Sequence, residues 1–192
     1  AAAIPTLNEV PVVLDMATTV AAYGKVKAKA QRGEMMPEGW MIDRQGKPLL
    51  DPTKSEEGFL LPIGGYKGYG LSLIVGILAG TLNGAAMGRQ VIDFNKDFST
   101  TTNTGQAIAI IDPSAFGDIT EFKQNVDTLV RELRGSERMP GVDRIWLPGE
   151  QSHEKRLSNE AHGIVLAPSL MKQLNDLAAQ LNIKPLNVQL QT

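Results

Sequence analysis

Leu61-Pro-Ile-Gly-Gly-Tyr-Lys-Gly-Tyr-Gly-Leu71 joins a glycine-rich loop directly to a long apolar run. The four glycines allow backbone angles and close approaches that a Cβ atom would prevent. Free N–H groups at the start of a helix favour an anion, and Lys67 adds a full positive charge. The stretch lacks the Gly-Lys-Ser/Thr ending of a P-loop and the glycine spacing of the dinucleotide fingerprint. It therefore predicts either an anion-binding loop or a purely structural turn.

The composition is typical of an ordinary globular protein. The 192 residues are 42% hydrophobic and 21% charged, with a net charge of -2, so one domain can bury a sizeable core. There is no basic excess and there are few aromatic residues, so nucleic acid is not an expected partner. Cysteine is absent, which excludes disulfides, thiolate zinc sites and thiol nucleophiles and makes the cytoplasm the expected compartment. The separation of His153 and His162 matches no metal-ligand spacing, so no metal site is expected.

The chain begins Ala1-Ala-Ala-Ile-Pro-Thr6, with neither an initiator methionine nor a secretory signal. This opening is typical of a segment from within a longer protein, or of a chain that has lost a leader. The apolar run at residues 70–82 is shorter than the ~20 residues that span a bilayer, so no membrane association is expected.

Short apolar strands alternate with helical segments, which predicts an α/β fold. Strands are predicted at residues 10–15, 106–111 and 144–147, with a brief strand or extended link at 164–166. Helices are predicted at residues 20–32, 70–82, 120–134 and 152–162 and from Ser169 onward. Residues 34–50 are interpreted as a surface excursion with a turn at 43–46, and residues 83–104 as a binding or interface loop.

The helix predicted at residues 70–82 is apolar on nearly every side, which predicts burial all round. Gly76, Gly80 and Gly84 fall on one stripe of it. We interpret this stripe as a groove against which the backbone of another element packs, with a subunit contact as a further interpretation.

Several polar residues adjoin predicted element ends. Asp15 closes a strand predicted to be buried on both faces, and α/β proteins hold ligands at such an edge. Alternatively, Asp15, Thr18 or Thr19 caps the helix that follows. His162 is predicted to interact with the last carbonyls of its helix, and Ser169 to cap the last helix.

Four pieces of the sequence together resemble one family. They are Pro11-Val-Val-Leu-Asp-Met-Ala-Thr18, Ala22-Tyr-Gly-Lys25, the stretch at 61–71 and Leu147-Pro-Gly-Glu150. In order and spacing they are similar to the non-Rossmann NAD(P)H-dependent malate/L-lactate dehydrogenase family, which also contains ureidoglycolate dehydrogenase, diketogulonate reductase and piperideine-carboxylate reductase. The resemblance runs from about residue 10 to residue 185. It implies a large mixed sheet flanked by helices, distinct from the classical dinucleotide domain, and an obligate homodimer.

The resemblance also implies a cofactor, NAD or NADP, and the residues that line it. These are Val13, Leu14, Asp15, Met16, Ala17, Tyr66, Lys67, Gly149, Glu150 and Gln151. A loop with a cation suits a phosphate, and an acid at a strand end can hold a ribose hydroxyl or orient a histidine. The implied reaction transfers a hydride between the nicotinamide and C2 of a small 2-oxo or 2-hydroxy acid, while a histidine exchanges the proton on oxygen.

The sequence departs from the family at the catalytic histidine, which belongs to an N-terminal half with no counterpart here. Neither His153 nor His162 lies in a matching motif, so neither is expected to be the catalyst. Asp15 is then expected to orient a histidine that is absent from this chain. Residues 1–185 are interpreted as the cofactor-binding portion of a larger dehydrogenase, inactive without its other half, and residues 186–192 as a frayed tail.

A second hypothesis is a non-catalytic assembly or dimerisation module, built on the apolar helix at residues 70–82 and the threonine-rich loop after it. A hydrolase is not expected, because the sequence has no Gly-x-Ser-x-Gly elbow. The sequence leaves open the choice between NAD and NADP and the identity of the 2-hydroxy acid.

Overall fold

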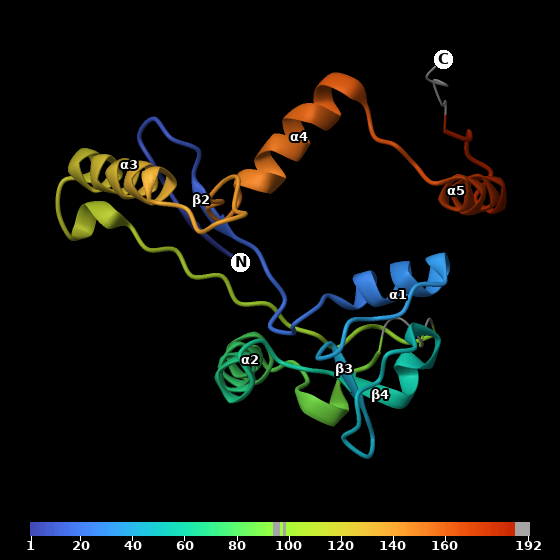
Figure 1. Ribbon diagram of the computed structural model, residues 1–192. Helices are drawn as coiled ribbons and strands as arrows, with labels where there is room; N and C mark the ends of the chain where they lie inside the picture. The colour runs from blue at the N-terminus through green and yellow to red at the C-terminus, as the bar shows by residue number, and fades with distance from the viewer. Residues whose placement is uncertain (94–96, 98, 187–192) are drawn as a thin grey trace. The chain divides into compact units, whose positions relative to one another are not determined.

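The computed structural model describes residues 1–93, 97 and 99–186. The chain forms two compact units, seen with their elements labelled in Figure 1. Unit 1 consists of Ala1 and Asp15–Phe122, and unit 2 of Ala2–Leu14 and Lys123–Thr192. The prediction for residues 187–192 lies outside the described residues.

The described residues of unit 1 form two α-helices and one antiparallel pair of strands. These are α1 (Tyr23–Arg32), β3 (Met41–Asp43), β4 (Gly58–Leu60) and α2 (Tyr66–Ala79). Short 3-10 turns accompany them: η1 (Pro52–Glu57), η2 (Thr81–Asn83), η3 (Gly88–Gln90) and η4 (Pro113–Ala115). In the β3–β4 pair, Ile42 lies opposite Phe59.

A small apolar core holds α1 against this strand pair. Val26 of α1, Met36 and Met41 are buried together, and four half-buried apolar side chains pack against them. The interpretation of residues 34–50 as a surface excursion is correct for most of these residues, which are exposed, but wrong for Met36 and Met41, which pack with Val26 of α1. The turn predicted at 43–46 is confirmed by a 3.1 Å hydrogen bond from the Gly46 N–H to the Asp43 carbonyl.

Helix α1 begins at Tyr23 rather than at residue 20, and no side chain caps its first turn. The predicted capping by Asp15, Thr18 or Thr19 is therefore wrong. The Thr19 hydroxyl instead donates to the Ala21 carbonyl at 2.8 Å, which fixes the bend before the helix.

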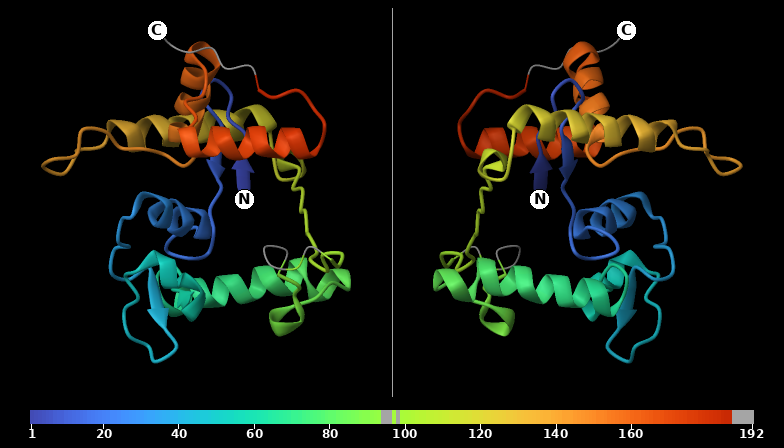
Figure 2. Two further views of the ribbon diagram at one scale, coloured as in Figure 1. Left: turned by 90° about the vertical axis from the view of Figure 1, so that its right-hand side faces the viewer. Right: turned by 90° about the vertical axis from the view of Figure 1, so that its left-hand side faces the viewer.

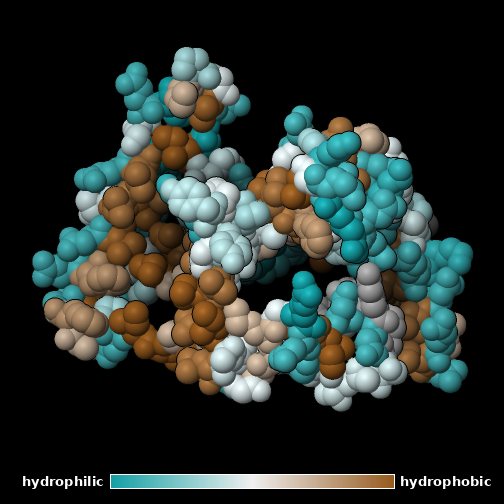
Figure 3. Space-filling model, turned by 90° about the horizontal axis from the view of Figure 1, so that it is seen from below, coloured by the Kyte–Doolittle hydropathy of each residue, from teal (hydrophilic) through white to brown (hydrophobic). Residues whose placement is uncertain are grey.

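Helix α2 begins at Tyr66 rather than at residue 70, because the chain enters the helix directly from Gly65. The prediction that it is buried all round is wrong. Its large aliphatic side chains are 40–56% exposed, and the described residues supply no element that covers them. Figure 3 shows apolar side chains gathered on the surface of the molecule.

The predicted glycine groove on α2 is confirmed at Gly80. A Cβ atom there would lie 2.9 Å from the Ala86 carbonyl oxygen, in the chain that follows η2. Figure 2 shows this chain turning back at the end of α2. Gly76 meets only the Met87 side chain, at 3.5 Å, and Gly84 instead ends η2 with a left-handed φ of 68°.

Up to residue 186, unit 2 combines a second antiparallel strand pair with three helices. Its elements are β1 (Ala2–Ile4), β2 (Val12–Leu14), most of α3 (Ile119–Gly135), α4 (Glu150–His162) and α5 (Pro168–Gln180). The helix predicted at 120–134 is confirmed as α3, and His162 lies 3.0 Å from the Ser158 carbonyl at the end of α4, as expected. Ser169 does not cap α5, which begins at Pro168 without a side-chain cap.

The strand predictions are confirmed only where a neighbouring strand is present. The first strand is shorter than predicted, Val12–Leu14, and Val13 and Leu14 are exposed rather than buried. Residues 106–111 and 144–147 form no strand, and Ile110 is 91% exposed. Apolar β-branched runs need partners for their N–H and C=O groups before they become strands, and the described residues provide none for these two. Residues 164–166 form a link, one of the two alternatives.

None of the helices within the described ranges is long and apolar enough to cross a membrane. The same residues contain no cluster of three or more His, Asp or Glu side chains that could hold a metal ion.

Gly68 provides a direct test of how the glycine-rich turn joins α2. A Cβ atom at this position would lie 2.0 Å from the Ile63 carbonyl oxygen, whereas one at Gly70 would meet nothing within 4 Å. We expect Gly68→Ala to lower the free energy of unfolding by about 2–3 kcal/mol, since the turn must move away from the helix. The matched change Gly70→Ala should be neutral or slightly stabilising. Equal midpoints for the two variants in urea unfolding would contradict this packing.

Candidate functional site

The glycine-rich turn of unit 1 is held against the segment that follows β2. Residues 18–20 and 61–63 exchange two backbone hydrogen bonds, of 2.8 and 3.0 Å, on either side of a bridge between Thr19 and Pro62. Asp15 lies just before the first of these segments. The two stretches singled out from the sequence therefore run side by side in unit 1.

The turn itself has the geometry that its glycines suggested. Gly64 and Gly65 have φ values of 57° and 62°, in the left-handed region that favours glycine. The first turn of α2 has neither a side-chain cap nor an acidic residue. Tyr66 is 80% exposed, and Lys67 is exposed and forms no ion pair with any residue that the structure describes. A cation thus accompanies the positive end of the helix dipole.

A second close approach lies in unit 2, between β2 and the turn before α4. The Val13 N–H donates to the Pro148 carbonyl at 3.0 Å. Gly149 has a φ of 97°, and a Cβ atom there would lie 3.1 Å from the backbone of Val13. Only glycine can adopt this positive φ and also approach Val13 so closely, so Pro148 and Gly149 pack directly against the backbone of β2.

The Glu150 side chain is turned into the protein and is only 7% exposed. Its Oε1 accepts hydrogen bonds from Nη2 and Nε of Arg134, at 2.6 and 3.1 Å. Its Oε2 accepts from the Leu147 N–H at 3.0 Å. Burial raises the pKa of Glu150, but the Leu147 N–H and Arg134 outweigh it, so the pKa lies below its ordinary value of 4.5. The carboxylate is therefore ionised at neutral pH and serves the turn before α4.

The remaining predicted residues near these turns face solvent. Asp15, Met16, Ala17 and Gln151 are exposed, and the Asp15 carboxylate has no hydrogen-bond partner among the residues that can be described. An exposed acid at this position is free to bind a hydroxyl group or a second side chain.

Asp127 of α3 is a buried structural carboxylate that no pattern in the sequence indicated. It is 1% exposed and accepts backbone hydrogen bonds from Leu7 at 3.0 Å, Asn8 at 2.9 Å and Glu9 at 3.4 Å. It thereby fixes the loop between β1 and β2. No local pattern could have revealed it, because its partners lie more than a hundred residues away in sequence.

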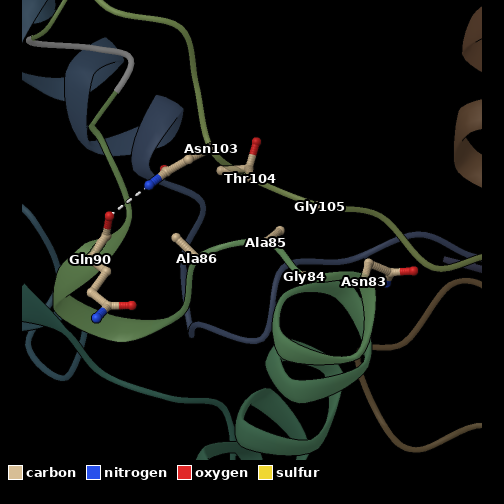
Figure 4. A pocket seen from close by; sticks show the side chains of 8 residues that line it. All are labelled: Asn83, Gly84, Ala85, Ala86, Gln90, Asn103, Thr104 and Gly105. Atoms are coloured by element: carbon tan, nitrogen blue, oxygen red, sulfur yellow. Dashed lines mark hydrogen bonds between the residues drawn. The ribbon is translucent and has the colours of Figure 1, made fainter.

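An open hollow of about 530 Å³ lies at the carboxyl end of α2 and contains none of the predicted site residues. Its lining residues are Asn83, Gly84, Ala85, Ala86, Gln90, Asn103, Thr104 and Gly105. Figure 4 shows the Asn103 amide donating to the Gln90 carbonyl, at 2.8 Å. The hollow belongs to the connection predicted to be a binding or interface loop, which stays a prediction; residues 94–96 and 98 of it lie outside the described range.

Comparison with solved structures identifies the fold as that of a group of dehydrogenases. The malate dehydrogenase of Entamoeba histolytica superimposes with a TM-score of 0.82 at 25% identity, over 97% of this chain and 55% of that one. The predicted α/β fold class is thereby confirmed, although the described residues form two antiparallel strand pairs rather than a large mixed sheet.

The sequence then gives the family. A model of the malate/L-lactate dehydrogenase family matches residues 1–175, and the chain belongs to this family. The malate/(S)-sulfolactate dehydrogenase of Methanothermus fervidus is 39% identical over 184 residues, which are 96% of this chain and 52% of the relative. The ureidoglycolate dehydrogenase (NAD(+)) of Escherichia coli K12 is 34% identical over 160 residues, 83% of this chain and 45% of the relative. The chain thus spans about half the length of these relatives.

Asp127 predicts a defined dependence of stability on pH. Burial raises its pKa, but the N–H groups of Asn8, Leu7 and Glu9 lower it further, to below 3.8. The stability that Asp127 contributes is therefore present above about pH 4 and is lost as the pH falls through the folded-state value. We expect Asp127→Asn to lower the thermal midpoint by about 5 °C at neutral pH, and this difference to shrink at acid pH.

The exposed Asp176 on α5 gives a matched control, since its pairing with Lys172 is a surface contact. Asp176→Asn should change the midpoint by less than about 1 °C at either pH. A difference between Asp127→Asn and the wild type that stays constant down to about pH 2 would show that the Asp127 charge has no role.

Proposed function

We propose that this chain is the cofactor-binding part of an oxidoreductase that transfers a hydride between NAD(P)H and a small 2-oxo or 2-hydroxy acid. The observation that carries the proposal is the pairing of residues 18–20 with residues 61–63, which sets the exposed Lys67 turn beside the segment after Asp15. The relatives support it, because their names describe dehydrogenases of malate, sulfolactate and ureidoglycolate, the last with NAD(+).

In this proposal each part of the site has a separate task. Lys67 and the amino end of α2 bind a cofactor phosphate, with Tyr66 beside them. Asp15 holds a ribose hydroxyl or orients a catalytic histidine supplied from outside this chain. The bound nicotinamide supplies or accepts the hydride. The other residues proposed to line the cofactor are Val13, Leu14, Met16, Ala17, Gly149, Glu150 and Gln151.

We also propose an oligomeric state and a cellular compartment for the protein. The substrate-binding and proton-transferring groups would come from the half of the relatives that has no counterpart in this chain. The active form would be a homodimer. The compartment we propose is the cytoplasm.

Titration with NADH and NADPH, followed by nicotinamide fluorescence, tests the phosphate-binding role of Lys67. We expect saturable enhancement with the wild-type chain and an affinity about tenfold weaker in Lys67→Gln, since a hydrogen bond to a charged group is lost. Lys47→Gln, at an exposed lysine in the turn that follows β3, should leave the affinity unchanged. Equal affinities in all three proteins would remove Lys67 from the site.

A second candidate function is a non-catalytic assembly or dimerisation module, favoured by the exposed apolar surface of α2. Ile74 of α2 is exposed, although it lies in a helix with no charged residue after Lys67. Contiguous exposed apolar surface marks an interaction site. For this alternative, we expect Ile74→Gln to lower the mass observed by sedimentation equilibrium, and no fluorescence enhancement with either nucleotide. A monomeric wild-type chain would contradict it.

A further inference from the structure

Arg134, near the end of α3, joins two acidic residues that are far apart in the sequence. Its Nη1 donates to Glu9 Oε2 at 3.1 Å, while its Nε and Nη2 both donate to Glu150 Oε1. These hydrogen bonds raise the pKa of Arg134, first through Glu150 and then through Glu9. Glu9 lies in the loop before β2, and Glu150 begins α4. One guanidinium therefore ties the approach to β2 to the Gly149 turn.

The neighbouring arginines do not make this connection among the described residues. Arg131, one turn earlier on α3, approaches Glu9 and Asp127 only at 3.6 and 3.8 Å. Arg144 lies 3.6 Å from Glu150, but it is engaged by Glu154 at 2.6 Å and stacks on Trp146 at 3.9 Å. Arg134 alone in this group donates hydrogen bonds to both Glu9 and Glu150.

The consequence of the bridge is seen at Val13. The Glu150 carboxylate, which is bound by Arg134, also accepts a hydrogen bond from the Leu147 N–H. This hydrogen bond joins the first and last residues of the turn at 147–150. The carbonyl of Pro148, inside this turn, receives the Val13 N–H at 3.0 Å. Glu9 lies four residues before Val13, and its backbone N–H is also bound by Asp127. Arg134 therefore fixes the Pro148 side of the Val13–Pro148 contact and shares the Glu9 side with Asp127.

We propose that Arg134 is a positioning residue, which sets the Gly149 turn against Val13 and so shapes the edge of β2 that faces the cofactor. This inference rests on the proposed function, because it takes Val13 and Gly149 to line NAD(P)H. In this arrangement the buried Glu150 side chain serves the turn, and only the backbone of Glu150 remains to line the cofactor. The fork of Arg134 matters, because a lysine ammonium has no fixed planar geometry with which to serve both carboxylates.

The test compares Arg134→Gln, Arg134→Lys and the matched control Arg131→Gln in the full chain. Hydrogen exchange at the Val13 amide reports directly on the contact with Pro148. We expect exchange there to be about tenfold faster in Arg134→Gln and in Arg134→Lys, and NADH affinity about tenfold weaker. Arg131→Gln should change both by less than about twofold. Unchanged Val13 exchange in a folded Arg134→Gln variant overturns the proposal.

Glu9→Ala removes only one side of the bridge, and alanine is chosen because glutamine would keep an amide oxygen that accepts from Arg134. It covers the case in which Arg134→Gln does not fold. It should speed Val13 exchange in the same direction by a smaller factor, and no change overturns the proposal. The results distinguish failure of the proposed function from failure of the positioning role of Arg134. A wild-type chain that binds neither nucleotide overturns the proposed function, whereas normal NADH affinity in Arg134→Gln overturns the positioning role alone.

Discussion

Two backbone hydrogen bonds between residues 18–20 and 61–63 are the constraint on which the candidate site of unit 1 depends. Backbone pairing is insensitive to side-chain changes and fixes the register of both segments. It holds the glycine-rich turn, and hence the start of α2, beside the segment that follows Asp15. The left-handed Gly64 and Gly65 then let the chain enter the helix without a capping side chain. An exposed lysine beside an uncapped helix start is the part of this arrangement suited to an anion.

Unit 2 obtains its order from charged groups rather than from a large apolar core. Asp127 receives three backbone N–H groups of the β1–β2 loop, and Arg134 holds Glu9 and Glu150. Both residues lie on α3, so a single helix anchors the chain before β2 and the turn before α4. Charges placed in this way are costly unless fully paired, and these side chains are hydrogen-bonded to partners.

Local patterns in the sequence predicted the helices and the glycine-rich turn well, because amphipathic spacing and glycine placement act over a few residues. Strands were predicted less well. Residues 106–111 have the composition of a strand, but strand formation needs a partner that no local pattern supplies. The burial expected for α2 failed for the same reason. Asp127 was missed because its partners lie more than a hundred residues away in sequence. Arg134 was missed because Glu9 is similarly distant, and Glu150 lies 16 residues away across a turn. The four motifs that carried the family resemblance did identify the family correctly.

Amide hydrogen exchange of the wild-type chain, with and without excess NADH, shows whether the glycine-rich turn and the segment after β2 bind the dinucleotide. If the turn at 64–67 and the segment around Asp15 bind the dinucleotide, their amides should exchange more slowly when NADH is present. Amides lining the hollow at the end of α2 should be unaffected. Slower exchange only at that hollow, or no slower exchange at any amide, would show that the turn at 64–67 and the segment around Asp15 do not bind the dinucleotide.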